Sequence, residues 1–122
     1  MDRDFPHYGD IYDVNLEPVV GSETGNSVTG RPGPALVVSN DSNNEFSDTV
    51  TVLPLTGQPA RKIYPFEALI PRGVEGLTSD SRVKANQIRT VDKRRLVRFR
   101  GPLPESLYAQ VKQAIKYHLE LD

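Results

Sequence analysis

The feature that most constrains the fold is that only one segment, residues 104–119, has the periodicity of an amphipathic helix. Its apolar residues recur every three or four positions, and lysine and glutamine occupy the opposite side. Pro104 suits the first helical position, and Glu105 lies at the positive end of the helix dipole. The earlier apolar segments are short and separated by turn residues, as β-strands are. The sequence therefore predicts a mainly β fold, a small antiparallel sheet or barrel, with a C-terminal α-helix.

The β-type segments occupy most of the remaining chain. Strands are predicted at residues 11–16, 35–38, 49–55, 63–70, 83–91 and 96–99, the fourth interrupted by a proline. A turn is predicted at residues 41–44. Residues 21–34, rich in glycine, are predicted to form a long loop, and such a loop in a small domain is usually functional or disordered. At 122 residues the chain has the size of one domain, so residues 1–122 are predicted to be a single domain.

The charges are distributed unevenly along the chain. Residues 82–100 hold eight bases and one acid, whereas residues 1–60 hold nine acids and two bases. This basic stripe of residues 82–100 is compatible with a phosphate-bearing partner. It is equally compatible with a solvated strand edge, where positive charges prevent edge-to-edge pairing. The overall pI of about 6.1 argues against a general nucleic-acid coat protein.

The sequence offers no convincing set of metal ligands. It contains no cysteine and two histidines, His7 and His118. His118 lies at the edge of the helical apolar stripe, so packing is its predicted role. The spacing of Asp41, Asn43 and Glu45 resembles the start of a calcium loop, but the glycine at the sixth position and the distal glutamate are missing. We therefore predict no metal ion and no cofactor.

The sequence predicts a cytoplasmic protein without a membrane partner. No apolar run approaches the length needed to cross a bilayer. Asp2 and Asp4 lie where a signal peptide would carry basic residues followed by an apolar stretch. The lack of cysteine suits a reducing compartment.

Three stretches in this order and spacing resemble the MazF/PemK (Kid) family of toxin endoribonucleases of type II toxin–antitoxin systems. They are GDIY at 9–12 leading to LEPVVGSE at 16–23, PALVVSND at 34–41 followed by TVTVLPLT at 49–56, and QIRTVDKRRL at 87–96. The resemblance implies an SH3-like β-barrel that forms a homodimer. It also implies an antitoxin partner whose disordered tail blocks the RNA groove. The implied reaction is cleavage of single-stranded RNA at a short sequence, by attack of the ribose 2′-hydroxyl on the adjacent phosphorus.

This reaction needs a base for the 2′-hydroxyl, an acid for the leaving oxygen and fixed donors for the charged phosphorane. Glu23 matches the loop glutamate of the family and is the candidate base, although alone it could be a solvated loop acid. Thr56 matches the threonine at the end of a strand and is the candidate phosphate donor, although it could instead cap the turn before Gly57. The resemblance implies a catalytic role for both.

The candidate catalytic arginine departs from the family pattern. Similar chains usually place arginine directly before the proline that opens the apolar strand, but Gly33 precedes Pro34 here. Arg31 lies two residues earlier, and we predict that it grips the phosphate, because guanidinium suits a bidentate contact. If the family arginine has been lost instead, Arg61 and Lys62 are the next cations to test.

Four polar residues are predicted to contact RNA: Ser22, Asn40, Asn86 and Gln87. The amides of Asn86 and Gln87 match the donor and acceptor faces of unpaired bases. Arg89 is compatible with an RNA contact or with a structural ion pair.

Two other classes of function remain open. A non-enzymatic toxin that binds a protein target is one, because the CcdB gyrase inhibitors share this family's fold. A barrel that binds RNA through the basic stripe without cutting it is the other. Glu23, Thr56 and a loop arginine favour the enzyme, and the displacement of that arginine favours the protein-binding toxin.

Overall fold

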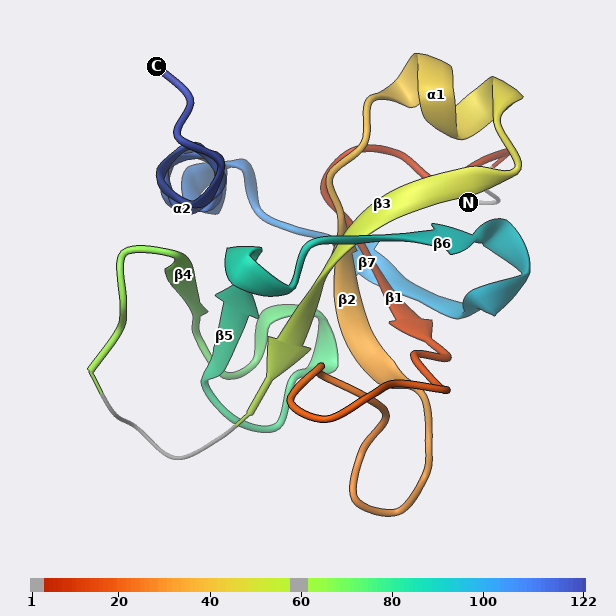
Figure 1. Cartoon of the computed structure of the whole chain (residues 1–122), viewed down its shortest axis with the longest axis horizontal. Helices are drawn as coiled ribbons and strands as arrows, with labels where there is room; N and C mark the ends of the chain where they lie inside the picture. The colour runs from red at the N-terminus through yellow and green to blue at the C-terminus, as the bar shows by residue number, and fades with distance from the viewer. Residues whose placement is uncertain (1–3, 58–61) are drawn as a thin grey trace.

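The computed structural model describes residues 4–57 and 62–122. A curled antiparallel sheet carries a short helix at one end and a longer C-terminal helix along one side (Figure 1). The strands are β1 (Asp10–Val14), β2 (Gly33–Val37), β3 (Thr49–Thr56), β4 (Glu67–Ile70), β5 (Ser81–Lys84), β6 (Arg89–Asp92) and β7 (Leu96–Pro102). The helices are α1 (Asp41–Phe46) and α2 (Tyr108–Leu119), and 3-10 turns span Val74–Gly76, Ala85–Gln87, Lys93–Arg95 and Glu105–Leu107. The predicted mainly β fold with a C-terminal helix is confirmed.

Strand β3 joins the two halves of the sheet. The strand order is β4-β5-β3-β2-β1-β7, and β6 also pairs with β3. The first half of β3 lies beside β6, with Val50 opposite Val91, and its end lies beside β5, with Leu55 opposite Val83. Because β3 changes partner along its length, the sheet curls. The last residue of β3, Thr56, lies at the junction of the two halves of the sheet.

Both faces of the central strands are covered by apolar side chains. Leu36 and Leu53 belong to a core that α2 covers with Val111 and Ala114. Val37 packs into a second core on the other face, together with the aromatic pair Tyr12 and Phe99. Successive strand residues point to opposite faces, so a strand buried on both sides needs an unbroken apolar run. The run at 35–38 therefore predicted a central strand correctly.

The predicted turn at 41–44 is wrong, because these residues begin α1. The side chain of Asn40 accepts a hydrogen bond from the Asn43 backbone N–H at 2.8 Å and caps the helix. Asn44 is fully buried and donates from its side-chain amide to the Ser39 carbonyl at 2.9 Å. A cluster of Asp, Ser and Asn residues favours turns and helix N-termini for the same reason, namely side-chain bonds to the backbone.

Two predicted strands are shorter than expected. In the segment 63–70 only Glu67–Ile70 forms a strand, and the residues before it, which include Pro65, lie outside the ladder. The segment 83–91 is divided by the 3-10 turn Ala85–Gln87, so β5 and β6 pair with different parts of β3.

The C-terminal helix differs from its prediction in two respects. Regular α-helix begins at Tyr108, after a 3-10 turn that follows Pro104. The side chain of His118 is exposed to solvent, so its predicted role in packing within this chain is wrong. Among the described helices, none has both the length and the apolar character needed to span a bilayer.

Candidate active site

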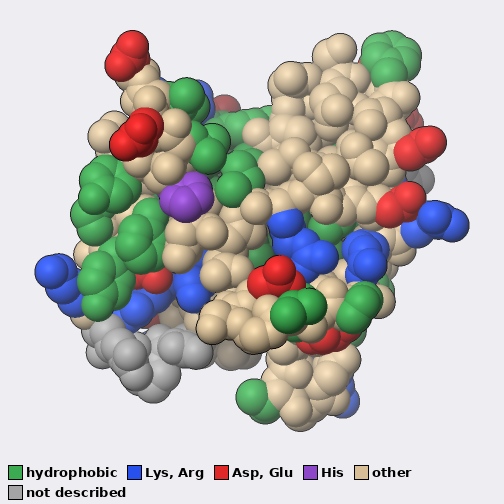
Figure 2. All heavy atoms as spheres, viewed as in Figure 1, with side chains coloured by type: hydrophobic (Ala, Val, Ile, Leu, Met, Phe, Trp, Pro, Cys, Tyr) green, Lys and Arg blue, Asp and Glu red, His purple; other side chains and the backbone are tan. Residues whose placement is uncertain are grey.

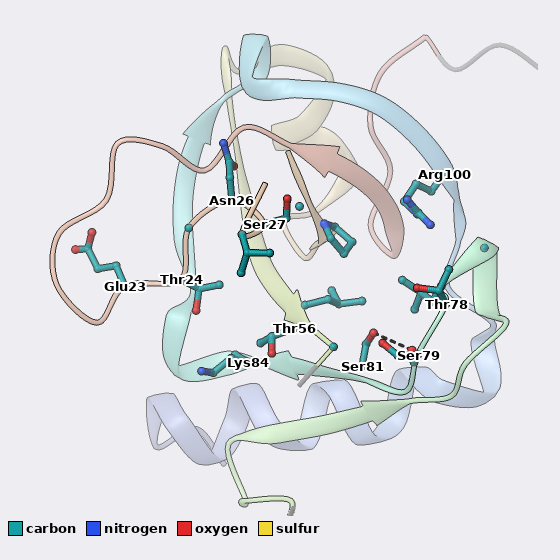
Figure 3. Close-up of a pocket in the computed structure, with 18 of the residues that line it drawn as sticks. Glu23, Thr24, Asn26, Ser27, Thr56, Thr78, Ser79, Ser81, Lys84 and Arg100 are labelled. Carbon is teal, nitrogen blue, oxygen red and sulfur yellow. Dashed lines mark hydrogen bonds between the residues drawn. The ribbon is translucent and has the colours of Figure 1, made fainter. Parts of the chain in front are cut away.

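A pocket of about 930 Å³ lies where the loop between β1 and β2 meets the end of β3 (Figure 3). Its walls come from loop residues 21–28, the start of β2, the end of β3, the segment 76–81, Lys84 of β5 and Arg100 of β7. The polar side chains that line it are Ser22, Glu23, Thr24, Asn26, Ser27, Thr56, Thr78, Ser79, Ser81, Lys84 and Arg100. The pocket thus collects hydroxyls, amides and two cations in one cavity.

Thr56 is the most firmly positioned of the predicted catalytic residues. It ends β3 in register with Arg82 of β5, and the preceding Leu55 is buried in the core. The Thr56 Oγ1 atom is shielded from solvent and has no hydrogen-bond partner within the part of the chain that the structure describes. An unsatisfied buried hydroxyl costs about 1–3 kcal/mol. A phosphate oxygen in the pocket is the kind of acceptor that would satisfy it, once a movement of the lining exposes the atom.

The next residue, Gly57, lets the chain leave β3 close to the segment 76–81. A Cβ at Gly57 would lie 2.5 Å from Ser79 Oγ, so a larger residue would displace that hydroxyl. Ser81 Oγ in turn donates to the Ser79 carbonyl at 3.2 Å. This wall of the pocket is therefore packed closely against the end of β3.

Glu23 lines the pocket from the opposite side, on the long loop. Its carboxylate accepts a hydrogen bond from the Val20 N–H at 2.8 Å, and Figure 3 shows it directed away from the cavity. Ser22 is exposed beside it and also lines the pocket. The loop glutamate and the strand threonine predicted from the sequence are thus brought to one cavity, but the carboxylate points out of it.

A set of side-chain hydrogen bonds holds this loop: those of Asn26 lie within the connection between β1 and β2, and that of Gln87 joins it to the turn after β5. Asn26 Oδ1 accepts from the Leu16 N–H at 2.7 Å, and the Asn26 N–H donates to Glu17 Oε2 at 2.9 Å. Gln87 Oε1 accepts from the Thr24 N–H at 3.0 Å. We call the bonds of Asn26 and Gln87 the loop clasp. Gln87 Oε1 already accepts one bond from the loop, and no bond of its amide nitrogen is seen among the described residues.

Arg31 lies on the same loop but is not among the described residues that line the pocket. It is exposed, and its carbonyl accepts from the Ser27 N–H at 2.9 Å. Lys62 is exposed and lies 5.6 Å from the centre of the Tyr64 ring. Arg61 falls outside the described residues. The structure therefore leaves Arg31 on the loop surface, near the pocket in sequence and outside its lining.

The three predicted RNA contacts from other segments, Asn40, Asn86 and Gln87, do not line the cavity. Asn40 caps α1. Asn86 is exposed in the 3-10 turn after β5, adjacent to Gln87. The lining consists of residues 21–28, 33–34, 55–57, 76–79, 81, 84 and 100, so it includes none of the three.

The basic stripe is divided among several structural contacts. Arg89 donates to the Leu16 carbonyl at 3.0 Å, and Arg95 donates to the carbonyls of Asn15 and Glu17. The stripe also forms ion pairs with carboxylates, namely Arg82 with Glu67, Arg94 with Asp92, and Arg98 and Arg100 with Asp13. Two of its members line the pocket, Lys84 and Arg100. The stripe is therefore neither a continuous phosphate-binding face nor a purely solvated edge.

Comparison with known proteins assigns this chain to a family. A family model described as a PemK-like, MazF-like toxin of type II toxin–antitoxin systems matches residues 7–119. The chain belongs to this toxin family. The endoribonuclease MazF9 of Mycobacterium tuberculosis is 38% identical over 118 residues, covering 93% of this chain and 95% of that protein. The endoribonuclease EndoA of Bacillus subtilis is 36% identical over 113 residues, covering 93% of each.

A solved structure agrees with this assignment. The crystal structure of MazF from Deinococcus radiodurans aligns with a TM-score of 0.78 and 26% identity, covering 96% of this chain and 98% of that one. The predicted MazF-like fold and family membership are confirmed. Within this MazF-like chain, sequence reasoning missed Lys84 and Arg100 as pocket residues. Both residues belong to the basic stripe, so their charge was the available signal. Strand alternation alone does not show which of the eight bases of the stripe faces a cavity.

Proposed function

We propose that this chain is a cytoplasmic endoribonuclease, the toxin of a toxin–antitoxin pair, which cuts single-stranded RNA in this pocket without a metal ion. The observation that carries the proposal is that Glu23 and Thr56, far apart in sequence, line one cavity with cationic groups. Family membership supports the same function, because the similar proteins are endoribonucleases by name.

The proposed reaction is an internal transfer at phosphorus. Glu23 accepts the proton of a ribose 2′-hydroxyl, whose oxygen forms a bond to the adjacent phosphorus. The bond from phosphorus to the 5′-oxygen breaks, and that oxygen takes up a proton. The products end in a 2′,3′-cyclic phosphate and a 5′-hydroxyl. Thr56 donates its hydroxyl hydrogen to a non-bridging oxygen, and Arg31 stabilises the charge of the phosphorane.

The resting geometry implies that the loop adjusts when RNA binds. The Glu23 carboxylate must leave the Val20 N–H to face the cavity, and Arg31 must turn inward from the loop surface. Both residues lie on one loop that is joined to the barrel mainly by polar contacts, so one movement can bring both to the phosphate.

Incubation of the pure protein with a long single-stranded RNA in EDTA tests the proposal. We expect discrete fragments that carry 5′-hydroxyl and 2′,3′-cyclic phosphate ends. Binding without cutting would indicate an RNA-binding barrel, and neither would indicate a toxin with a protein target. Activity that is lost in EDTA and restored by magnesium would contradict the metal-free reaction.

The proposed active form is a homodimer. Apolar side chains gather on the surface over α2 and β4 (Figure 2). Tyr117, Leu119 and Leu121 are each about half exposed near the end of α2. A small domain gains core by covering such a face with a second copy. Light scattering at micromolar concentration should give twice the chain mass, and the monomer mass alone would contradict the proposal.

The antitoxin is proposed to act by occupying the loop and the pocket, folding as it binds. An acidic, partly apolar segment would complement Lys84 and Arg100 in the lining. A structure of the complex should show Arg31, Thr56 and Gln87 covered. A complex that left these three residues open to solvent would refute occlusion.

A further inference from the structure

Arg100 is turned into the pocket by an irregularity of β7. In the pairing of β1 with β7, Ile11 lies opposite Gly101, whereas the next residue, Tyr12, lies opposite Phe99. Arg100 is therefore the extra residue of a β-bulge. Bulges redirect side chains and are frequent beside active sites. This one places an arginine in the lining of a cavity whose other charged residues come from the loop and from β5.

The bulge depends on the glycine that follows. Gly101 has φ of 147°, a conformation that L side chains rarely adopt, and a Cβ there would collide with the Glu75 carboxylate. The backbone at Gly101 and the 3-10 turn at Val74–Gly76 thus pack against each other. In this Arg-Gly pair of β7, Arg100 supplies the side chain, and Gly101 adopts the backbone conformation that directs it into the pocket.

The guanidinium of Arg100 is held at two of its three nitrogens. Its Nη1 donates to Asp13 Oδ1 at 3.0 Å, and its Nε donates to the Glu75 carbonyl at 3.3 Å. The side chain is 17% exposed, and Figure 3 shows it reaching into the cavity above Thr78. A guanidinium fixed in this way loses little conformational entropy when its remaining N–H groups bind an anion.

A purely structural role does not account for this arrangement. Asp13 already has a second partner, because Arg98 Nε donates to its Oδ2 at 3.0 Å. Arg98 is 67% exposed and lines a second surface hollow, which Arg100 also borders. The carboxylate thus has one partner, Arg98, that lines only the second hollow, whereas its other partner, Arg100, also lines the main pocket.

We propose that Arg100 and the hydroxyl of Thr78 form a second phosphate subsite, which binds a backbone phosphate next to the one that is cut. The inference rests on the proposed function, since it names how the pocket holds a nucleic-acid strand. Asp13 is the positioning residue of this subsite, because it fixes the guanidinium without facing the strand. The subsite recognises phosphate and not the base or the 2′-hydroxyl.

Binding of a labelled single-stranded DNA of mixed sequence, measured against salt concentration, tests the subsite. DNA lacks the 2′-hydroxyl, so the proposed reaction cannot cut it. Each phosphate contact contributes about 0.7 to the slope of log affinity against log salt for single strands. We expect Arg100→Ala to lower the slope by about 0.7 and the affinity about tenfold. The control Arg98→Ala removes the same charge from the same strand and should leave the slope unchanged.

Two further variants keep the test decisive. Arg100→Gln retains an amide that can donate to Asp13, so it should fold even if Arg100→Ala does not, and it should show the same loss. Asp13→Asn removes a negative charge, which would raise affinity through long-range attraction alone. If Asp13 positions Arg100, this variant should bind DNA more weakly than the parent.

The outcomes separate this inference from the proposed function. A folded Arg100→Gln protein with the parent's affinity and salt slope overturns the subsite, as does a parent that does not bind the strand. If the parent cuts RNA and Arg100→Gln cuts it with unchanged KM, the subsite fails and the nuclease stands. If the parent does not cut RNA but Arg100→Gln loses DNA binding, the nuclease fails and the subsite stands.

Discussion

The two sides of the pocket differ in how their residues are positioned. Thr56 ends a strand whose neighbours are buried and whose backbone pairs with β5. Glu23 and Arg31 lie on a loop between β1 and β2 that is largely exposed and is fastened by side-chain bonds such as that of Gln87 to Thr24. Burial of an apolar side chain contributes about 1.5–3 kcal/mol, whereas a polar contact of this kind contributes about 0.5–1.5 kcal/mol. One side of the site is therefore preformed, and the other can move.

This difference suits two different roles in the proposed reaction, a donor with a fixed position and groups that move when RNA binds. A preformed hydroxyl suits a donor that must already be in place when charge develops on phosphorus. A movable carboxylate and guanidinium suit groups that close over the strand after it enters. The comparison is testable, because each side can be changed without altering the other.

The largest effect is expected from the movable side. Arg31→Ala should lower the rate of RNA cleavage about 10²–10³-fold, or roughly 3–4 kcal/mol of barrier, because the guanidinium acts on the charged phosphorane. Arg31→Lys should restore little, since an ammonium lacks the two-pronged geometry. The residue is exposed, so the melting temperature should not change.

Single-turnover cleavage by the parent and by Arg31→Ala checks this prediction. Lys84→Ala, which removes a cation from the pocket lining, is the matched control. If Arg31→Ala cuts at the parent's rate and Lys84→Ala does not, the cation belongs to the preformed side and the comparison is broken.

A somewhat smaller effect is expected at Thr56. Thr56→Val keeps the shape and removes a hydroxyl bond to a charged group, worth about 1.5–3 kcal/mol, so turnover should fall about 10–10²-fold. Stability should be unchanged or higher, because Oγ1 is shielded and has no partner among the described residues. Thr90→Val on β6 is the control, since Thr90 is exposed and paired with Thr51 in the sheet. A Thr56→Val enzyme that is destabilised but fully active would assign the hydroxyl to the fold instead.

The sequence predicts the preformed side of the molecule well, for a physical reason. Segments such as residues 35–38 and 49–55 have the short, apolar or β-branched pattern of a buried strand. Burial of their side chains determines their structure. The turn predicted at residues 41–44 failed because the same Asp, Ser and Asn residues suit a turn and a helix start. The burial of Asn44, which binds Ser39 five residues earlier, distinguishes the two, and that burial depends on the rest of the fold.

The candidate site was predictable only in part. Glu23 and Thr56 were found through the resemblance to the family, and both line the pocket. Arg31 was assigned by sequence position, and no pattern could show that it lies on the loop surface. The bulge that aims Arg100 depends on the register between β1 and β7, which strand alternation does not reveal. The role of each of these residues in catalysis stays a prediction.

A moderate effect is expected from the loop clasp. Gln87→Met has a similar length but cannot accept the Thr24 N–H. Loss of this bond should cost about 1 kcal/mol of unfolding free energy and about fivefold in cleavage, through a less ordered loop and the loss of the Gln87 amide as a predicted RNA contact. Urea denaturation and hydrogen exchange at Thr24 measure the two effects. Faster exchange at Thr24 without any change in cleavage would show that the order of the loop does not limit the reaction.

The smallest effect is expected from an exposed polar pair away from the pocket, which serves as the reference for the clasp. Hydrogen bonds from Arg94 lower the pKa of Asp92, and Asp92 in turn raises the pKa of Arg94. Because the folded pKa of Asp92 lies below its unfolded value, its contribution to stability is present above the unfolded pKa. That contribution is lost as the pH falls through the folded pKa. Arg94→Ala should therefore lower the urea midpoint slightly at neutral pH and not at all in strong acid, with cleavage unchanged. Urea midpoints of the parent and of Arg94→Ala, measured at neutral pH and in strong acid, check this. If the midpoint at neutral pH falls as much as in Gln87→Met, exposed polar contacts stabilise this fold regardless of where they lie.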